Sequence, residues 1–467
     1  MDSMTQRIVR GLWFTILERN FIQASSFVTF FIIVSHLSLK DFGLLQLLFS
    51  VIGPGTTIAL IGLDRLIVSD IAVLRAQKNE GAIRQLLVEY SVTGSALLGA
   101  SFVFAWFLKG YLSQFYVTGL AQFYWALVCL VSAQATMNFT SVIFEAYEQF
   151  NLSFWTKWCE SLVRLSVVAS FFLWFSFSLQ SILWAYVLAK VVSGLFSVLL
   201  LPRVIQKRST FQKKQHILLS IFKKHGKWEI ISSFVLTISD NIGPWFVNFY
   251  VSTEAVALLA FTQKVSTACM SLMPIKSVLF PILSHALGES REKAFLLIST
   301  VRKYSFLITC CFLLVSISLI RFPILWFTPQ YIDSLILIRL ALLHLFVDVF
   351  TLGQSIIFYA RKAQKRNFFI SIFSAALSIV LQIIGVLLFK AAGVIISWLC
   401  VGVIVGIVRE YTIHKHLDLP HTSLRSLFWY DARDKEILAS IIVQIRALFL
   451  KTFGAFLGLM GCKSSIR

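Results

Sequence analysis

A basic segment, Pro202–Lys227, lies near the middle of the chain between two regions built from long apolar runs. It carries eight lysine and arginine residues and no aspartate or glutamate. The runs on either side are about 20 residues long, which is the length that an α-helix needs to cross a hydrocarbon core of about 30 Å. Basic loops between membrane helices are retained on the cytoplasmic side. The segment therefore predicts a membrane protein in two halves, joined by a cytoplasmic loop.

The composition excludes most other classes of protein. Of the 467 residues, 58% are hydrophobic and 14% are charged, and the mean hydropathy is +0.81, which is far too apolar for a water-soluble fold of this length. The net charge of +20 would suit a nucleic-acid-binding protein, but the basic residues gather in loops predicted to be cytoplasmic, so we expect no nucleic-acid partner. The seven cysteines show no Cys-x-x-Cys spacing. They predict no metal site and no disulfide framework, and we expect no cofactor.

The alternation of apolar runs and basic loops predicts an all-α polytopic membrane protein of about twelve transmembrane helices, with both termini in the cytoplasm. Lys40-Asp41 opens the second of these helices and Thr253-Glu254 opens the eighth, each just after a helix with one polar face. This is expected for two six-helix lobes related as a parallel repeat around a central cavity. The predicted units are an N-terminal lobe (1–201), a basic cytoplasmic linker (202–227), a C-terminal lobe (228–413) and a cytoplasmic tail (414–467) with an amphipathic helix.

Two of the predicted helices, Gly11–Val34 and Trp228–Val251, are polar along one face and apolar along the other. Such helices face lipid or packed helices on one side and a polar space on the other. Glycine–proline pairs at Gly53-Pro54 and Gly243-Pro244 should kink the second and the seventh predicted helix.

Charged residues within the predicted spans are candidates for function, because a charge at the bilayer centre costs on the order of 3 kcal/mol or more. The cations are Arg19, Lys190, Lys264, Lys276 and Arg339, and the acids are Glu18, Asp240 and Asp348. Two of the cations share a helix face with neutral polar residues. Gln23 and Ser26 lie on the face of Arg19, and Thr267 and Ser271 lie on the face of Lys264. We hypothesise that the cations and these neighbours bind an anionic substrate and that the acids carry a coupling proton. The alternative is that the charges only form structural ion pairs between helices.

No motif for enzymatic chemistry is present in the sequence. The chain has no G-x-x-x-x-G-K-[ST] segment, and Gly226-Lys227-Trp228 is not a phosphate-binding loop, so ATP hydrolysis is not expected. No H-E-x-x-H motif or other grouping offers the spacing of a metal site or an activated nucleophile. The sequence therefore favours a protein that is not an enzyme.

Several short motifs follow one another in an order that resembles a known family. They are Asp41-Phe42-Gly43, Gly62-Leu63-Asp64-Arg65, Glu148-Gln149-Phe150 with Arg164 beyond it, Asp240, Ala257–Lys264 and Phe280-Pro281-Ile282-Leu283-Ser284. Over about residues 10–410 the chain resembles the bacterial polysaccharide flippases of the O-antigen transporter type. These belong to the multidrug/oligosaccharidyl-lipid/polysaccharide exporter (MOP) superfamily. The chain departs from the family pattern at Ala257 and Leu259, where glycine and tyrosine are usual.

The resemblance implies that the first, seventh and eighth helices line a central cavity between the lobes. It also implies a flippase that moves a polyprenyl-pyrophosphate-linked oligosaccharide across the bacterial cytoplasmic membrane by alternating access, for cell-surface polysaccharide assembly. Expected partners are this lipid-linked substrate, membrane lipids, and a polysaccharide polymerase with its chain-length protein. The competing hypothesis is a multidrug and toxin extruder of the same superfamily, but cationic drugs favour an acidic cavity. A scaffold without transport would not be expected to retain so many charges within its spans.

Overall fold

The computed structural model describes residues 21–64, 79–115, 120–147, 149–174, 177–204, 217–271, 291–354 and 363–417, with residues 67–68, 70–71, 74 and 357–358. In the first half the helices are Phe21–His36, α2 (Leu39–Ser50), α3 (Ile52–Ala59), α5 (Glu80–Phe115), η1 (Leu120–Phe123), α6 (Tyr124–Ala146), α7 (Phe150–Trp174), α8 (Leu179–Leu200) and η2 (Leu201–Arg203). They are followed by α9 (Ile217–Ile221), η3 (Phe222–Gly226), α10 (Lys227–Asn241), α11 (Gly243–Tyr250), α12 (Thr253–Ser271), α14 (Arg291–Leu319), α15 (Arg321–Phe327), η4 (Pro329–Ser334), α16 (Leu335–Leu342), α17 (His344–Phe350), α19 (Gln364–Phe389) and α20 (Ala391–Leu417).

The prediction of an all-α polytopic membrane protein is confirmed. The described residues contain no strand, and eight of their helical segments are long and apolar enough to cross a membrane. The other four predicted spans are also helical where they are described, namely Phe21–His36, α7, α12 and the pair α16–α17. That all twelve segments cross the membrane stays a prediction.

Two helices break where the glycine–proline pairs predicted a kink. The second predicted helix divides into α2 and α3 at Val51, and the seventh divides into α10 and α11 at Ile242. Pro244 then lies in the first turn of α11, where its missing N–H group costs no hydrogen bond. A third break, at Leu343 between α16 and α17, was not predicted. No glycine or proline lies within these two helices.

Some helices extend beyond their predicted bounds. The pattern of the sequence predicts a cytoplasmic turn over residues 145–158 and a helix that begins at Cys159, but α7 begins at Phe150. In the same way, α14 begins at Arg291 where Tyr304 was expected, and α20 continues to Leu417 beyond the predicted lobe boundary. Charged residues end an apolar run without ending a helix, because glutamate, lysine and arginine are good helix formers. The described part of the basic segment is helical as well, in α9 and η3.

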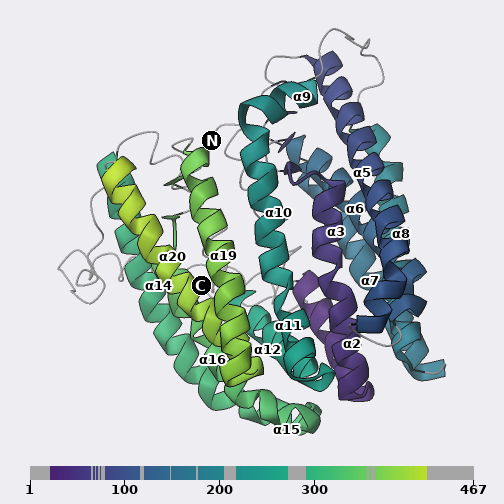
Figure 1. Cartoon of the computed structure of the whole chain (residues 1–467), viewed down its shortest axis with the longest axis vertical. Coiled ribbons are helices and arrows are strands. Elements are labelled where there is room, and N and C mark those ends of the chain that lie inside the picture. Colours follow the sequence, from purple (N-terminus) through teal and green to yellow (C-terminus); the bar gives the residue numbers. More distant parts are fainter. Residues whose placement is uncertain are drawn as a thin grey trace, which may run out of the picture.

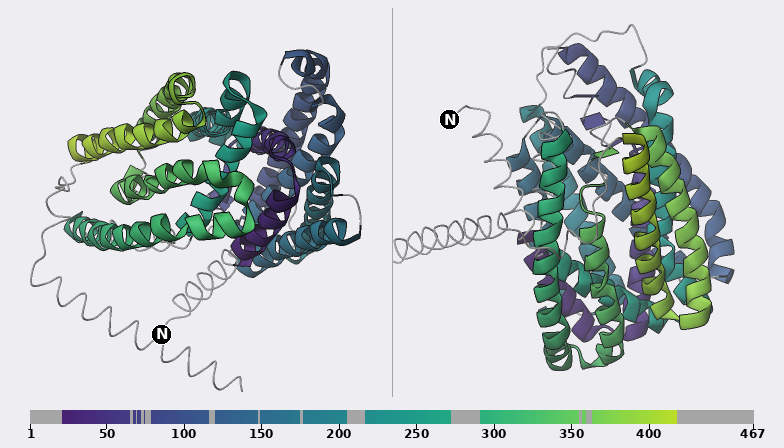
Figure 2. Two further views of the ribbon diagram at one scale, coloured as in Figure 1. Left: turned by 90° about the horizontal axis from the view of Figure 1, so that it is seen from below. Right: turned by 90° about the vertical axis from the view of Figure 1, so that its left-hand side faces the viewer.

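The helices gather into two groups on either side of a central seam. Figure 1 shows α5, α6, α7 and α8 on one side and α14, α16, α19 and α20 on the other, with α2–α3 and α10–α12 between them. The seen-from-below view in Figure 2 shows the same division. The grouping fits the predicted lobes, whose number of helices and repeat relationship stay predictions.

The seam depends on close backbone approach and on hydrogen bonds. A Cβ atom on Gly43 of α2 would collide with the backbone carbonyl of Thr253 at the start of α12. Along the same seam, Trp245 Nε1 donates to Ser50 Oγ at 2.7 Å, and Thr57 Oγ1 donates to Thr237 Oγ1 at 3.3 Å. The glycine of the Asp41-Phe42-Gly43 motif is therefore explained by the close packing of α2 on α12.

Aromatic side chains join the two groups at the end of the molecule that carries α15, the lower end in Figure 1. Phe261 of α12 stacks on Tyr331 of η4 with ring centroids 4.5 Å apart, and Phe30 contacts Phe261 at 5.6 Å. Gln330 Nε2 donates to the carbonyl of Val34 at 2.6 Å. These contacts hold the helix Phe21–His36, α12 and η4 together at this end of the molecule.

Candidate functional site

A cavity of about 130 Å³ lies among the helix Phe21–His36, α2, α7, α8 and α12. Six of its described lining residues are apolar, four of them phenylalanine, and six are polar. The polar residues are Gln23, Ser26, Gln46, Arg164, Tyr186 and Lys264. The cavity lining therefore contains two cations and, among the described residues, no carboxylate.

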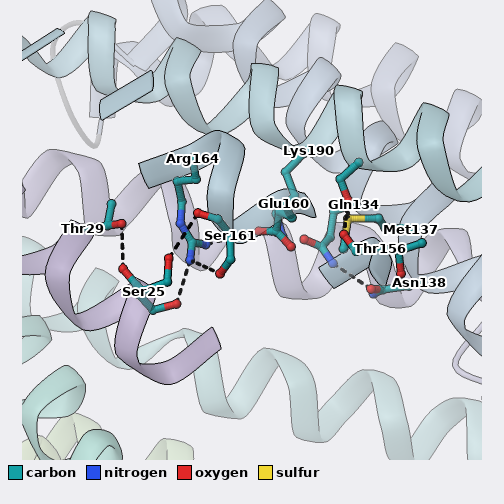
Figure 3. A network of polar contacts seen from close by, with 12 residues as sticks. Ser25, Thr29, Gln134, Met137, Asn138, Thr156, Glu160, Ser161, Arg164 and Lys190 are labelled. Carbon is teal, nitrogen blue, oxygen red and sulfur yellow. Dashed lines mark hydrogen bonds and ion pairs between the residues drawn. The ribbon is translucent and has the colours of Figure 1, made fainter. Parts of the chain in front are cut away.

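Arg164 is held in place by three helices. Its Nη2 donates to Ser26 Oγ at 2.7 Å and its Nη1 contacts Glu160 Oε1 at 3.2 Å, one turn earlier in α7. The guanidinium carbon also lies 5.5 Å from the centre of the Tyr186 ring of α8, a favourable cation–π distance. Ser25 Oγ donates to the carbonyl of Ser161 at 3.2 Å and fixes the helix Phe21–His36 against α7 (Figure 3).

Glu160 lies between two cations. Its Oε1 contacts Lys190 Nζ of α8 at 2.6 Å as well as Arg164, and Figure 3 shows Lys190 reaching down to this carboxylate. The side chains of Glu160 and Lys190 are only 11% and 15% exposed. Burial of a charge is tolerated when it is paired and hydrogen-bonded, so the three side chains form a structural unit. One positive charge of this unit is not neutralised within it.

Lys264 adds a further positive charge to the unit. It lies within electrostatic range of Arg164 and Lys190, although it is on α12, in the other half of the chain. Its side chain is exposed even though α12 is an apolar helix, so the ammonium group faces a polar space. We call Glu160, Arg164, Lys190 and Lys264 the charge cluster; it combines three cations with one carboxylate.

Lys264 also lines a second cavity, of about 540 Å³, formed entirely by the second half of the chain. This larger cavity lies among α10, α12, α16, α17, α19 and α20. Its polar lining residues are Ser239, Asp240, Gln263, Lys264, Ser266, Thr267, His344, Ser374 and Ser378, and Trp398 forms part of its wall. Lys264 is thus shared by the two cavities.

The structure brings together some of the predicted site residues. Gln23, Ser26 and Lys264 line the smaller cavity, and Asp240, Lys264 and Thr267 line the larger one. Lys190 pairs with Glu160 beside the smaller cavity. Their predicted roles in binding and coupling stay predictions.

Other predicted residues lie elsewhere. Arg339 is exposed on α16 and Asp348 is half-buried on α17, and neither lines one of these two cavities. Ser271 is the last residue of α12, but its side chain lies outside the described part of the chain, as do Glu18, Arg19 and Lys276.

The sequence analysis did not select Glu160, Arg164 and Tyr186 as site residues. The signal for two of them was present, because Glu160 and Arg164 are four residues apart and share one helix face. Beginning the helix at Cys159 placed Glu160 at a helix end, where a charge is unremarkable. With α7 beginning at Phe150, both residues fall near the middle of a 25-residue helix.

Among the described residues, no group of three or more histidine, cysteine, aspartate or glutamate side chains is placed to hold a metal ion. The six cysteines in the described part of the chain are free thiols.

A family model described as polysaccharide biosynthesis protein matches residues 8–287. The chain belongs to this family. A comparison with curated protein sequences finds no match. The match includes the segments of the smaller cavity, from Gln23 to Lys264, and it ends before α14.

Solved structures share the fold of this polysaccharide biosynthesis protein. The lipid II flippase MurJ in an inward closed conformation matches with a TM-score of 0.67 at 12% identity, over 97% of this chain and 99% of MurJ. An inward-facing MATE multidrug resistance transporter of the MOP superfamily gives a TM-score of 0.66 at 17% identity, over 84% of this chain and 92% of the transporter. A MOP superfamily transporter from Pyrococcus furiosus, described by the reverse polarity of its binding pocket, gives a TM-score of 0.62 at 15% identity, over 86% of this chain and 95% of the transporter. The predicted resemblance to the MOP superfamily is confirmed.

Proposed function

We propose that this protein is a flippase for a polyprenyl-pyrophosphate-linked oligosaccharide, moving it from the inner to the outer leaflet of the bacterial cytoplasmic membrane for cell-surface polysaccharide assembly. One observation carries the proposal: Arg164 and Lys264 line one cavity inside a membrane protein, and Glu160 offsets only part of the positive charge around it. The match to a polysaccharide biosynthesis family and the fold shared with a lipid II flippase support it.

The chemistry of the smaller cavity suits a pyrophosphate. A guanidinium group offers paired donors to phosphate oxygens, and a lysine adds a point charge. Ser26, Gln23 and Gln46 supply neutral hydrogen-bonding groups beside the two cations. The apolar walls raise the strength of these interactions by excluding water, while the polyprenyl chain stays in the surrounding lipid.

Transport by this route requires alternating access. With the basic segment in the cytoplasm, the end that carries α15 faces outward, and the contacts of Phe30, Phe261 and Tyr331 close that side. Release to the outer leaflet then requires these contacts to separate while the other ends of the two helix groups approach each other. Both termini are cytoplasmic in this proposal, and a polysaccharide polymerase with its chain-length protein would receive the product.

A MATE-type exporter is the second candidate, because MATE transporters share the fold about as closely as the lipid II flippase does. Asp240 in the larger cavity is the observation that favours it, since a carboxylate attracts cationic drugs or a coupling cation. The positive charge cluster opposes it, because it repels a cationic drug. The Pyrococcus furiosus transporter supports the use of pocket polarity as the criterion between the two functions.

The test is transport of a fluorescent polyprenyl-pyrophosphate-linked glycan in proteoliposomes. Losing a charge-assisted contact costs about 1.5–3 kcal/mol, so Arg164→Ala and Lys264→Ala should each lower apparent affinity by roughly 10- to 150-fold. Arg164→Lys should recover part of the loss, because the charge remains and the paired donors do not. Arg339→Ala, which removes an exposed cation outside both cavities, is the matched control and should transport normally. Undiminished transport by both cavity variants, or efficient export of a cationic dye by the wild type, would contradict the proposal.

We also propose Asp240 as the proton carrier of a coupled cycle. Its side chain is exposed on α10 and lines the larger cavity together with Lys264 and His344, so it has access to polar space within the membrane. Asp240→Asn should retain substrate binding and lose the acceleration of transport by an imposed pH gradient. Asp348→Asn, outside both cavities, should keep the response. A full response by Asp240→Asn would exclude this role.

A further inference from the structure

The larger cavity differs in chemistry from the charge cluster. Its volume of about 540 Å³ falls within the range of about 300–1,000 Å³ for small-molecule sites. Among the described residues, four serines line it, and the charged lining residues are Asp240 and Lys264, of which Lys264 is shared with the smaller cavity. A lining of this kind offers many neutral donors and acceptors and little net charge. It suits a neutral, polyhydroxylated ligand better than an anion.

One hydroxyl of this lining lacks a partner. Ser266 is 5% exposed, and its Oγ makes no hydrogen bond to any of the described residues. A buried polar group without a partner costs about 1–3 kcal/mol, which ordinary core packing avoids. Ser266 lies two residues from Lys264 on α12, and both line the cavity. Among the described residues, this hydroxyl is therefore available to a ligand in the cavity that Ser266 lines.

Trp398 of α20 adds an aromatic surface to the lining of the cavity. Gly402 lies one turn further along α20 and packs so closely on α17 that a Cβ atom would lie 2.6 Å from Val347 Cγ1. The close approach fixes the wall of the cavity where α20 crosses α17. A pyranose ring has polar hydroxyls at its edge and apolar C–H groups on its faces, so a tryptophan face and a set of serines match its two kinds of surface.

We propose that the larger cavity is a glycan subsite, which holds the first sugars of the substrate while the smaller cavity holds the pyrophosphate. Lys264, present in both linings, marks the junction between phosphate and sugar. The subsite rests on the proposed function, because it assigns the second part of the same substrate. It also gives the protein a means to distinguish a loaded carrier from the bare polyprenyl pyrophosphate.

The experiment compares two probes on the full-length protein in detergent: undecaprenyl pyrophosphate, and the pyrophosphate-linked glycan extracted from cells that make the polysaccharide. Binding is measured by native mass spectrometry or thermophoresis, and each variant is checked by thermal unfolding. Ser266→Ala and Trp398→Leu should weaken binding of the glycan-bearing probe by about 3- to 10-fold and leave the bare pyrophosphate unchanged. Ser266→Ala should not lower thermal stability, because the lost hydroxyl has no partner among the described residues.

The controls remove the same groups elsewhere. Ser318→Ala deletes an exposed hydroxyl of α14, and Trp326→Leu deletes a tryptophan that is 87% exposed on α15. Neither should alter the binding of either probe. Arg164→Ala should weaken both probes, because both contain the pyrophosphate.

The outcomes separate the subsite from the function on which it rests. If Arg164→Ala weakens both probes while Ser266→Ala and Trp398→Leu change neither, the glycan subsite is wrong and the flippase proposal stands. Equal weakening of both probes by Trp398→Leu would also overturn the subsite, since the residue would then act on the pyrophosphate or on folding. If the wild type binds neither probe, the proposed function fails and the subsite fails with it.

Discussion

At the scale of single residues, Glu160 determines the properties of the charge cluster. It is the one carboxylate among three cations, and a single oxygen, Oε1, contacts both Arg164 and Lys190. A buried ion pair contributes little net stability when it is intact, but removing one partner leaves an uncompensated charge. Arg164 in turn donates to Ser26 in the smaller cavity, so the carboxylate positions a residue that we assign to substrate binding.

We therefore expect Glu160→Gln to lower the free energy of unfolding by about 3–5 kcal/mol, because Arg164 and Lys190 both lose their counter-charge. The measurement is thermal unfolding in detergent. Glu145→Gln removes an exposed carboxylate that accepts a hydrogen bond from Ser141, and it should cost less than about 1 kcal/mol. The double variant Glu160→Gln/Lys190→Met should recover part of the stability, since it removes one of the two unpaired cations. Equal stability of Glu160→Gln and Glu145→Gln would show that the cluster is not a buried ion pair in solution.

At the scale of helices, the sequence predicted the elements better than their ends. Gly53-Pro54 and Gly243-Pro244 located two breaks to within a few residues, because proline and glycine act on the backbone directly. The break at Leu343 had no such signal, since neither α16 nor α17 contains a glycine or a proline. The start of α7 was missed by nine residues, because Asn151, Ser153, Thr156 and Lys157 interrupt its first turns and indicate a loop. That error hid the Glu160–Arg164 pair, whereas Lys264 and Asp240 were found because they interrupt apolar runs.

Gly43 is the residue on which the contact between α2 and α12 depends most directly. A methyl group there would meet the carbonyl of Thr253, and the backbone cannot move aside as a side chain can. Gly43→Ala should therefore lower the free energy of unfolding by about 1–3 kcal/mol, as overpacking does elsewhere. Gly99→Ala is the matched control, because a Cβ atom there would have no neighbour within 4 Å among the described residues. It should be neutral or stabilising by about 0.5–1 kcal/mol, from the better helix propensity of alanine. Thermal unfolding of both variants measures the difference, and equal effects would show that the approach of α2 to α12 is looser than described.

At the scale of the whole molecule, the proposed function makes the two cavities and the closed end parts of one transport path. Three members of the charge cluster lie on α7 and α8 of the first helix group, and Lys264 lies on α12, between the two groups. The aromatic contacts of Phe30, Phe261 and Tyr331 lie beyond it, at the end that carries α15. A substrate bound at the cluster cannot leave through that end unless the contacts separate. The sequence indicated the polar helix faces that form the path, but not which end was closed, because closure depends on the relative positions of the two groups.

Locking the closed end should therefore stop transport without stopping binding. Ser35 Oγ of the first described helix donates to the carbonyl of Phe327, the last residue of α15, at 3.3 Å, so cysteines at positions 35 and 327 are within reach of a short bifunctional cross-linker. In a variant whose native cysteines are replaced, Ser35→Cys/Phe327→Cys should lose nearly all transport of the pyrophosphate-linked glycan after cross-linking, and a cleavable linker should restore it. Each single cysteine treated in the same way should transport normally. Retained binding in the cross-linked protein would place the block at the opening step, because the charge cluster does not include either position. Full transport by protein shown to be completely cross-linked would contradict alternating access through this end, because transport would then proceed while these contacts stay together.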